Sequence, residues 1–301
     1  MMERIYRDER GSVIVLAALM MVVFLGFLAL VIDVGNLYLE KSRLQKAVDA
    51  AVLAGVQELP VWPDDAVHAA QYAAAQNGLN GENAEILVGE KDRSVQAVGS
   101  RTVELFFANS LGFPNPTLRA SATASIQPLT AGEGAVPLGV DESRQLIYGD
   151  VVKLKVGDST VGNFGALALT GPGAKDYKTD LQNGYGFELE IGTVLDTQTG
   201  NLAGPTRDAV SYRISGCSGT FDHHPSVCSR VVLIPVYKPV AIQSNQVKQV
   251  QIVGFATFFL ESVTSTNEGA EVVGRFIQKA ITGSISANQT DYGTYGYKLT
   301  Q

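Results

Sequence analysis

An uncharged apolar run near the N-terminus constrains this chain more than any other feature. Residues Ser12 to Ile32 are 21 consecutive positions without a charge, and 14 of them are Leu, Ile, Val or Phe. As an α-helix the run is about 31 Å long, which matches the hydrocarbon core of a bilayer. Its insertion is favourable by roughly 6 kcal/mol. The sequence therefore predicts a membrane-spanning helix over residues 12–32, with Asp33 where the helix leaves the lipid.

The span differs from a cleaved signal peptide, because its apolar core is longer than the roughly 7–15 residues of such a peptide and no A-x-A site follows it. Charge does not choose an orientation, since three basic residues stand on each side of the span: Arg4, Arg7, Arg10, Lys41, Arg43 and Lys46. The short N-terminus cannot form a domain, and the cysteines on the long side suit an oxidising exterior. We expect a single-pass protein of the cell membrane with a cytoplasmic N-terminus and an extracytoplasmic bulk.

The helical pattern continues past Asp33 and ends near Leu59, before Pro60 and Pro63. Apolar residues recur at helical spacing as one stripe: Leu37, Leu44, Val48, Ala51 and Gly55. Small residues leave a smooth face that another helix or sheet can approach closely, so we expect helix packing at Ala47, Ala51, Ala54 and Gly55. The sequence predicts a continuous anchor and rod helix within residues 1–59.

This helix carries a recognisable combination of motifs. A glycine precedes the span, Asp-x-Gly ends it, a tyrosine follows, and the helix continues as LQKAVDAAVLAG; the motif positions are Gly11, Asp33, Gly35, Tyr38, Leu44, Gln45 and Asp49. The stretch from Arg10 to about Gly55 resembles the N-terminal segment of TadE/TadG-like proteins of the tight-adherence (Flp) pilus system. The resemblance implies a role in pilus assembly, with membrane lipid and other assembly proteins or pilin as partners.

The sequence differs from many TadE/TadG-like proteins in two features. Family members cut by a prepilin peptidase carry a glutamate five residues after the cleaved glycine, whereas the fifth residue after Gly11 is Leu16. The resemblance therefore implies the uncleaved, TadG-like branch. Larger TadG-like proteins also carry a von Willebrand-type domain with an Asp-x-Ser-x-Ser metal pattern. The similar stretch here starts at Asp141 and fails at Gln145, so we do not expect that domain.

Beyond the rod we expect an α+β fold in two parts. Residues 60–127 predict a small membrane-proximal α+β unit, with helices over 64–78 and 101–113 and strands over 84–89, 94–99 and 117–126. The turn-rich segment 127–137 is the expected boundary. Residues 128–301 predict a mostly β extracytoplasmic domain, with strand-like runs at 151–157, 184–192, 209–215, 230–240, 249–263 and 271–282.

The segment GCSGTFDHHPSVC suggests the one local site. Cys217 and Cys228 are the only cysteines and fit a local disulfide. Together with His223 and His224 they are also the ligand types that zinc accepts. Zinc modules bring their ligands in close pairs, however, and adjacent histidines in an extended loop point opposite ways. We expect a disulfide here rather than a metal site, with free thiols as the other alternative.

Composition and motifs exclude several function classes. The net charge is −7 and no basic block is present, which argues against a nucleic-acid partner. The sequence contains neither a G-x-S-x-G elbow nor a phosphate-binding P-loop, and it has three histidines. We therefore expect no enzyme, no catalytic residue, no cofactor and no metal.

The expected function is that of a non-enzymatic component of Flp pilus assembly. It would act through helix packing and extracytoplasmic protein–protein contacts, with a homo-oligomer through the N-terminal helix as an added option. The alternative is a membrane-tethered binding module for a carbohydrate or surface polymer, whose groove would contain Tyr185, Tyr212, Tyr292 and Tyr295. A tethered hydrolase using His223 or His224 is a third hypothesis.

Overall fold

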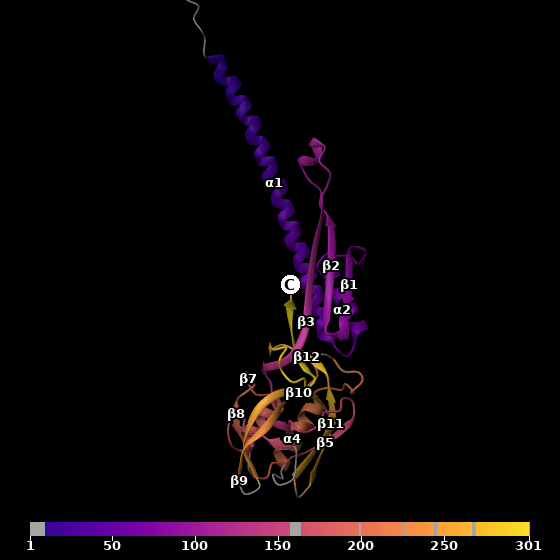
Figure 1. Ribbon diagram of the computed structural model, residues 1–301, viewed down its shortest axis with the longest axis vertical. Coiled ribbons are helices and arrows are strands. Elements are labelled where there is room, and N and C mark those ends of the chain that lie inside the picture. Colours follow the sequence, from indigo (N-terminus) through magenta and orange to yellow (C-terminus); the bar gives the residue numbers. More distant parts are fainter. Residues whose placement is uncertain are drawn as a thin grey trace, which may run out of the picture.

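Figure 1 shows the computed structural model, in which a long helix carries a folded body at one end. The structure describes residues 10–156, 164–198, 200–225, 227–243, 246–266 and 269–300. The first half of the helix projects alone. The second half lies beside one β-sheet, and a second sheet with two helices follows further along the same axis (Figure 1). The expected combination of a long N-terminal helix, a small helix-and-strand region and a mostly β C-terminal part is confirmed.

Helix α1 (Arg10–Gly55) runs without a break from the apolar run into the folded body. Among the helices of the described residues, it alone is long and apolar enough to cross a membrane. The large apolar side chains of its first part are exposed, whereas Leu44, Val48 and Val52 are fully buried. The helix therefore changes its surroundings along its length, from an unpacked apolar half to a half that belongs to a protein core.

Small residues let that second half approach its neighbours closely. After the short turn η1 (Val56–Glu58), helix α2 (Pro63–Gln76) folds back against α1 and buries Ala66, Ala70 and Ala74. Gly55 is at the closest approach, because a Cβ added there would lie 2.6 Å from the carbonyl oxygen of Ala66. The alanines of α2 recur every four residues, so they line one face of the helix.

The first sheet packs against both α1 and α2. Its strand order is β1–β2–β3–β14–β12, and β13 and β7 also pair with β3. The bounds are β1 Ala84–Val88, β2 Ser94–Thr102, β3 Thr117–Gly132, β7 Leu189–Glu190, β12 Lys279–Ile281, β13 Ser284–Ile285 and β14 Thr294–Thr300. Short 3-10 turns lie at Gly81–Asn83 (η2), Glu90–Asp92 (η3) and Ala108–Leu111 (η4). Alternation in β3 directs Ala120, Ala124 and Ile126 to the same core as Leu44 and Val48.

The second sheet has the order β5–β11–β10–β9–β4–β6, with β8 paired to β10. The bounds are β4 Leu138–Asp141, β5 Val151–Val156, β6 Phe164–Ala166, β8 Val194–Asp196, β9 Val231–Gln243, β10 Gln246–Thr266 and β11 Gly269–Ile277. Helices α3 (Ala174–Asn183) and α4 (Ala203–Ser215) share one core with this sheet, through residues such as Tyr177, Val210 and Phe258. A separate cluster, which includes Leu129 of β3 and Phe255 of β10, connects the second sheet to the first.

Two predicted elements are wrong. Residues 209–215, expected as a strand, lie in α4; the buried positions Thr206, Ala209, Val210 and Arg213 recur at helical spacing only when the residues before 209 are included. The helix expected over 101–113 is instead the end of β2 followed by a loop and η4. The Val103 amide donates to the carbonyl of Pro116 at the base of this loop, and Gly112 ends η4 with a φ of 86°. Of the run 184–192, Leu189 and Glu190 alone form a strand.

The expected boundary at 127–137 is not a break in the fold. Strand β3 continues through it to Gly132. The last strand, β14, pairs antiparallel with β3, for example Tyr297 with Ile126. The C-terminal residues therefore form part of the first sheet. Local sequence patterns place β3 and β14 in different domains, whereas the pairing between these strands joins them in one sheet.

The contrast between two glycines of α1 tests the packing of this core. Gly55→Ala places a methyl group against the backbone of α2, and we expect a loss of about 1–3 kcal/mol in unfolding free energy. Gly35→Ala is the matched control, because nothing lies within 4 Å of its added Cβ. The control should be neutral or gain up to about 1 kcal/mol from helix propensity. Chemical denaturation of the full chain in detergent micelles measures both, and equal effects would contradict the close approach.

Candidate functional site

Asp33 lies at the end of the apolar run and binds a distant loop. Its side chain is 3% exposed. One carboxylate oxygen accepts from the amide of Phe106 at 2.7 Å, the other accepts from the amide of Ala108 at 2.7 Å, and Phe107 donates to the second oxygen at 3.1 Å. The carboxylate thus satisfies three successive backbone amides of the loop between β2 and β3. This contact fixes the loop, residues 103–116, to the point where α1 leaves its apolar half.

A line of polar contacts continues from Asp33 along α1. Asn36 donates to the carbonyl of Glu104 at 3.3 Å, and Lys41 donates to the carbonyl of Arg119. Further on, Gln45 donates to the carbonyl of Ser121 at 3.1 Å and to the carboxylate of Asp49 at 2.9 Å. Hydrogen bonds therefore join α1 to the hairpin formed by β2 and β3 near the apolar run. Nearer the C-terminal end of α1, apolar packing joins them.

A cleft of about 1100 Å³ opens where the two sheets meet. Its walls come from the link between α1 and α2, from the loop closed by Cys217 and Cys228, and from residues 276–282. Trp62 stands on one wall and meets His224 of the opposite wall edge to face, with ring centroids 6.5 Å apart. The cleft is thus formed by segments that are far apart in the sequence.

A carboxyl group and an ammonium group of the cleft, those of Glu58 and Lys279, have shifted pKa values. Burial raises the pKa of the Glu58 carboxyl, and the nearby charge of Asp65 raises it further, against the opposing charge of Lys279. Burial lowers the pKa of the Lys279 ammonium, which Glu58 partly offsets. Each group is therefore easier to neutralise than an exposed one. The cleft combines apolar walls with two partly desolvated charges of opposite sign.

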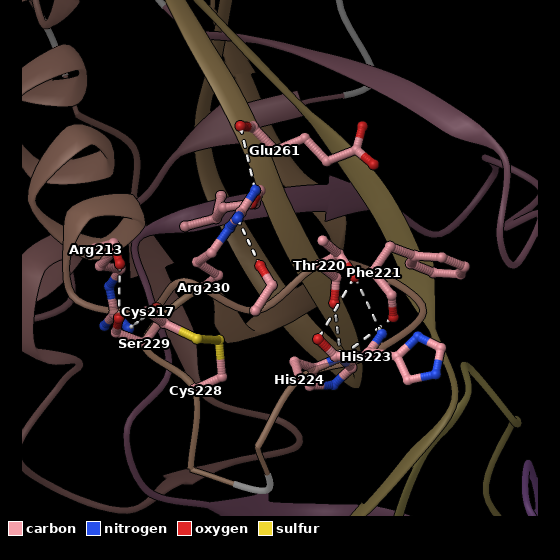
Figure 2. Close-up of a disulfide and its surroundings, with 12 residues drawn as sticks. Arg213, Cys217, Thr220, Phe221, His223, His224, Cys228, Ser229, Arg230 and Glu261 are labelled. Carbon is pink, nitrogen blue, oxygen red and sulfur yellow. Dashed lines mark hydrogen bonds between the residues drawn. A yellow bond between two sulfur atoms is a disulfide. The ribbon is translucent and has the colours of Figure 1, made fainter.

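The loop 217–228 is closed by a disulfide and held at both ends (Figure 2). Cys217 and Cys228 have Cα atoms 5.5 Å apart. Arg213 donates to the carbonyl of Ser229 at 3.1 Å, and the Ser229 hydroxyl donates to the carbonyl of Arg213 at 2.6 Å. Arg230 donates to the carbonyls of Gly219 and Leu260, both at 2.7 Å. Because both sulfurs are bonded to each other, they are not thiolate ligands for zinc.

The histidines of this loop have different surroundings. Nδ1 of His224 lies 3.2 Å from the carbonyl oxygens of Thr220 and Phe221, so that nitrogen faces the loop's own backbone (Figure 2). The His224 ring also packs at 5.2 Å from the ring of Phe259. His223 is exposed. The structure gives His224 a packing role at the cleft wall.

The similarity of this chain to a known protein family lies in the long helix α1 and the turn after it. Residues 11–58 match the family of putative Flp pilus-assembly TadE/G-like proteins. The match begins at Gly11 and covers α1 and η1, in agreement with the resemblance of the TadE/TadG-like motif. No curated protein and no solved structure matches the chain. The TadE/G-like match implies involvement in Flp pilus assembly.

The TadE/G-like motif residues have unequal surroundings. Asp33, Gln45 and Asp49 make the hydrogen bonds described above, and Leu44 is fully buried. Tyr38 is 76% exposed, and Gly35 has open space around it. Four of the seven motif residues are therefore explained by the chain's own fold. Tyr38 is not.

The expected packing face lies within the chain's own fold. Ala47 and Ala51 are fully buried in the chain's own core, Gly55 touches α2, and Ala54 is half-buried. These residues do pack closely, but against α2 and the first sheet. They are not available to a helix of another protein while this fold is intact.

The four tyrosines proposed for a ligand groove do not come together. Tyr295 is fully buried in the core around α1, and burial raises its pKa to about 12. Tyr292 packs on the core of the second sheet, Tyr185 packs on the cluster between the sheets, and Tyr212 is exposed on α4. The cleft beside Trp62 was missed, because no local pattern connects residues near 60, 222 and 279.

Removing the Asp33 carboxylate tests the loop contact. Asp33→Ala leaves three amides without their acceptor, and we expect the loop to lose on the order of 3 kcal/mol of local stability. Hydrogen exchange at Phe106, Phe107 and Ala108 in the full chain in vesicles measures this loss. Asp33→Asn keeps one carbonyl acceptor and should fall in between. Asp49→Ala is the matched control on the same helix, and equally fast exchange in that variant would contradict the assignment.

Removing the disulfide tests the cleft wall. In the double variant Cys217→Ser and Cys228→Ser we expect the unfolding free energy to fall by about 3 kcal/mol, because the open loop gains entropy in the unfolded state. Trp62 is the only tryptophan and should emit at longer wavelength once His224 moves away. Dithiothreitol should reproduce the change in the parent chain and do nothing to the double variant. An unchanged emission spectrum would contradict the contact across the cleft.

Proposed function

We propose that this protein is a single-pass membrane component of Flp pilus assembly that works by protein–protein contact and not by catalysis. The observation that carries the proposal is the division of α1. The helix in the TadE/G-like match has one apolar, unpacked half and one half that is the centre of a folded core. Such a helix holds a folded body at a fixed short distance from a bilayer.

The proposed topology has the short N-terminus in the cytoplasm and the folded body outside. Apart from the loop between β2 and β3, which reaches along α1 to Asp33, the described elements lie beside or beyond the C-terminal half of that helix, so the folded body lies on one side of the membrane (Figure 1). The disulfide supports an oxidising exterior as that side.

A non-catalytic role agrees with what the conspicuous side chains do. Asp33 binds backbone amides, the cysteines are bonded to each other, and His224 packs within its own loop. Each of these groups has a structural use. The TadE/G-like match points in the same direction, because its name describes assembly.

We infer that the exposed face of α1 around Tyr38 contacts another assembly component or pilin. Val34, Tyr38 and Leu39 are exposed large apolar side chains beyond the span, and they are not covered by the hairpin that binds Asp33. Val34 and Tyr38 are four residues apart, so they lie on one face of the helix, and such an apolar pair is suited to packing against a second helix. Tyr38 is also a motif residue whose side chain the fold leaves exposed.

The test compares two exposed tyrosines in a pilus-forming cell that lacks the native gene. Tyr38→Ala should abolish or strongly reduce pili in electron micrographs, with normal protein level and membrane fractionation. Tyr72→Ala on α2, where the side chain is 69% exposed, should leave piliation intact. A photo-crosslinking residue at position 38 then distinguishes a pilus component from a second copy of this chain. Normal piliation with Tyr38→Ala would overturn the contact.

A further inference from the structure

We propose that the loop between β2 and β3 inserts its apolar side chains into the outer leaflet of the membrane, as a second contact beside α1. The loop exposes four large apolar residues: Phe106, Phe107, Leu111 and Phe113. Leu111, on η4, is 78% exposed and Phe106 is 64% exposed. An exposed cluster of this kind marks an interaction surface rather than a solvated loop.

The contact with Asp33 determines where this surface lies. Asp33 directly follows the apolar run, so it stands at the boundary between hydrocarbon and headgroups. The amides of Phe106, Phe107 and Ala108 donate to it, which places the loop at the same depth. The loop is also the part of the folded body that reaches furthest along α1 toward its N-terminal end (Figure 1). Its apolar side chains therefore continue the lipid-facing surface of the helix.

The backbone of the loop suits an environment poor in water. Non-helical backbone near hydrocarbon must have its polar groups satisfied within the protein. Here eight amides of the loop donate within the chain: those of Val103, Leu105, Phe106, Phe107, Ala108, Ser110, Gly112 and Phe113. Pro114 and Pro116 have no amide hydrogen. The amides of a solvent-exposed loop can donate to water instead and do not need so many acceptors within the protein.

The side-chain chemistry of the loop also favours lipid. Residues 105–118 contain no charged side chain. Phenylalanine and leucine side chains on a monotopic element enter the boundary between headgroups and acyl chains by about 5–10 Å. The polar contacts from Asn36 to Gln45 begin on the water side of this point. The transition from apolar tip to polar hairpin thus follows the transition from lipid to water.

The consequence is orientation. A single helix can rotate about its axis and tilt, because the bilayer contacts it equally on all sides. A second apolar contact beside it fixes which side of the folded body faces the membrane. The Tyr38 side of α1 then has a defined direction for a partner.

The experiment uses the full chain in vesicles of phosphatidylcholine and phosphatidylglycerol. In a Trp62→Phe background, Leu111→Trp reports from the loop, and Phe113→Trp is a second reporter in case the first disturbs folding. Tyr72→Trp on α2 is the matched control at an exposed site. We expect blue-shifted emission and quenching by acyl-brominated phosphatidylcholine for both loop reporters. The control should show neither effect.

The outcomes separate this inference from the proposed membrane anchor on which it rests. Failure of the chain to float with vesicles would overturn the anchor itself. Flotation with loop reporters that behave like the control would overturn the loop contact alone. Blue-shifted emission without bromine quenching, lost on dilution of the protein in lipid, would assign the surface to a second copy of the chain and overturn the lipid contact.

Discussion

The bond between Asp33 and three loop amides is the interaction on which the upper part of this structure depends. A carboxylate beside hydrocarbon must keep its hydrogen bonds, and exposed amides of a loop near lipid must find acceptors. The carboxylate of Asp33 and the loop amides meet both requirements at once, because the amides of Phe106 and Ala108 each donate to the carboxylate at 2.7 Å. The charge that ends the apolar run is thus also the docking point for the folded body.

Strand β3 transmits this docking to the rest of the chain. It begins just after the loop, pairs with β2 and β14, and reaches the cluster between the sheets at Leu129. At the same junction Arg93 binds Asp291 at 2.6 Å and lies over the ring of Tyr295 at 5.0 Å. Partial burial pushes the pKa of Asp291 upward, but hydrogen bonds from Arg93, Gly293 and Tyr295 hold it below its ordinary value. The ionised carboxylate therefore helps to join residues almost 200 positions apart.

Local patterns predicted what local interactions decide. The apolar run, the stripe through Leu44 and Val48, and the alternation of β3 each lie within one element, so their period indicated helix or strand correctly. The helix predicted over 101–113 was wrong because the helical spacing of Phe106, Phe107 and Leu111 does not reflect a buried face. These three side chains are exposed on a loop. The pairing of β14 with β3 and the cleft between Trp62 and His224 depend on distant segments, which periodicity does not reveal. The disulfide could be predicted from the sequence because two cysteines allow a single pairing.

The burial of the small-residue face changes how such a helix can meet other proteins. A stripe of alanine and glycine after a membrane span suggests helix–helix assembly, but here α2 and the first sheet already cover it. What remains for partners on α1 is the span itself and the face at Val34, Tyr38 and Leu39. Contacts made there leave the core of the folded body intact. Assembly and folding can then use the same helix without competing, because they use different residues of it.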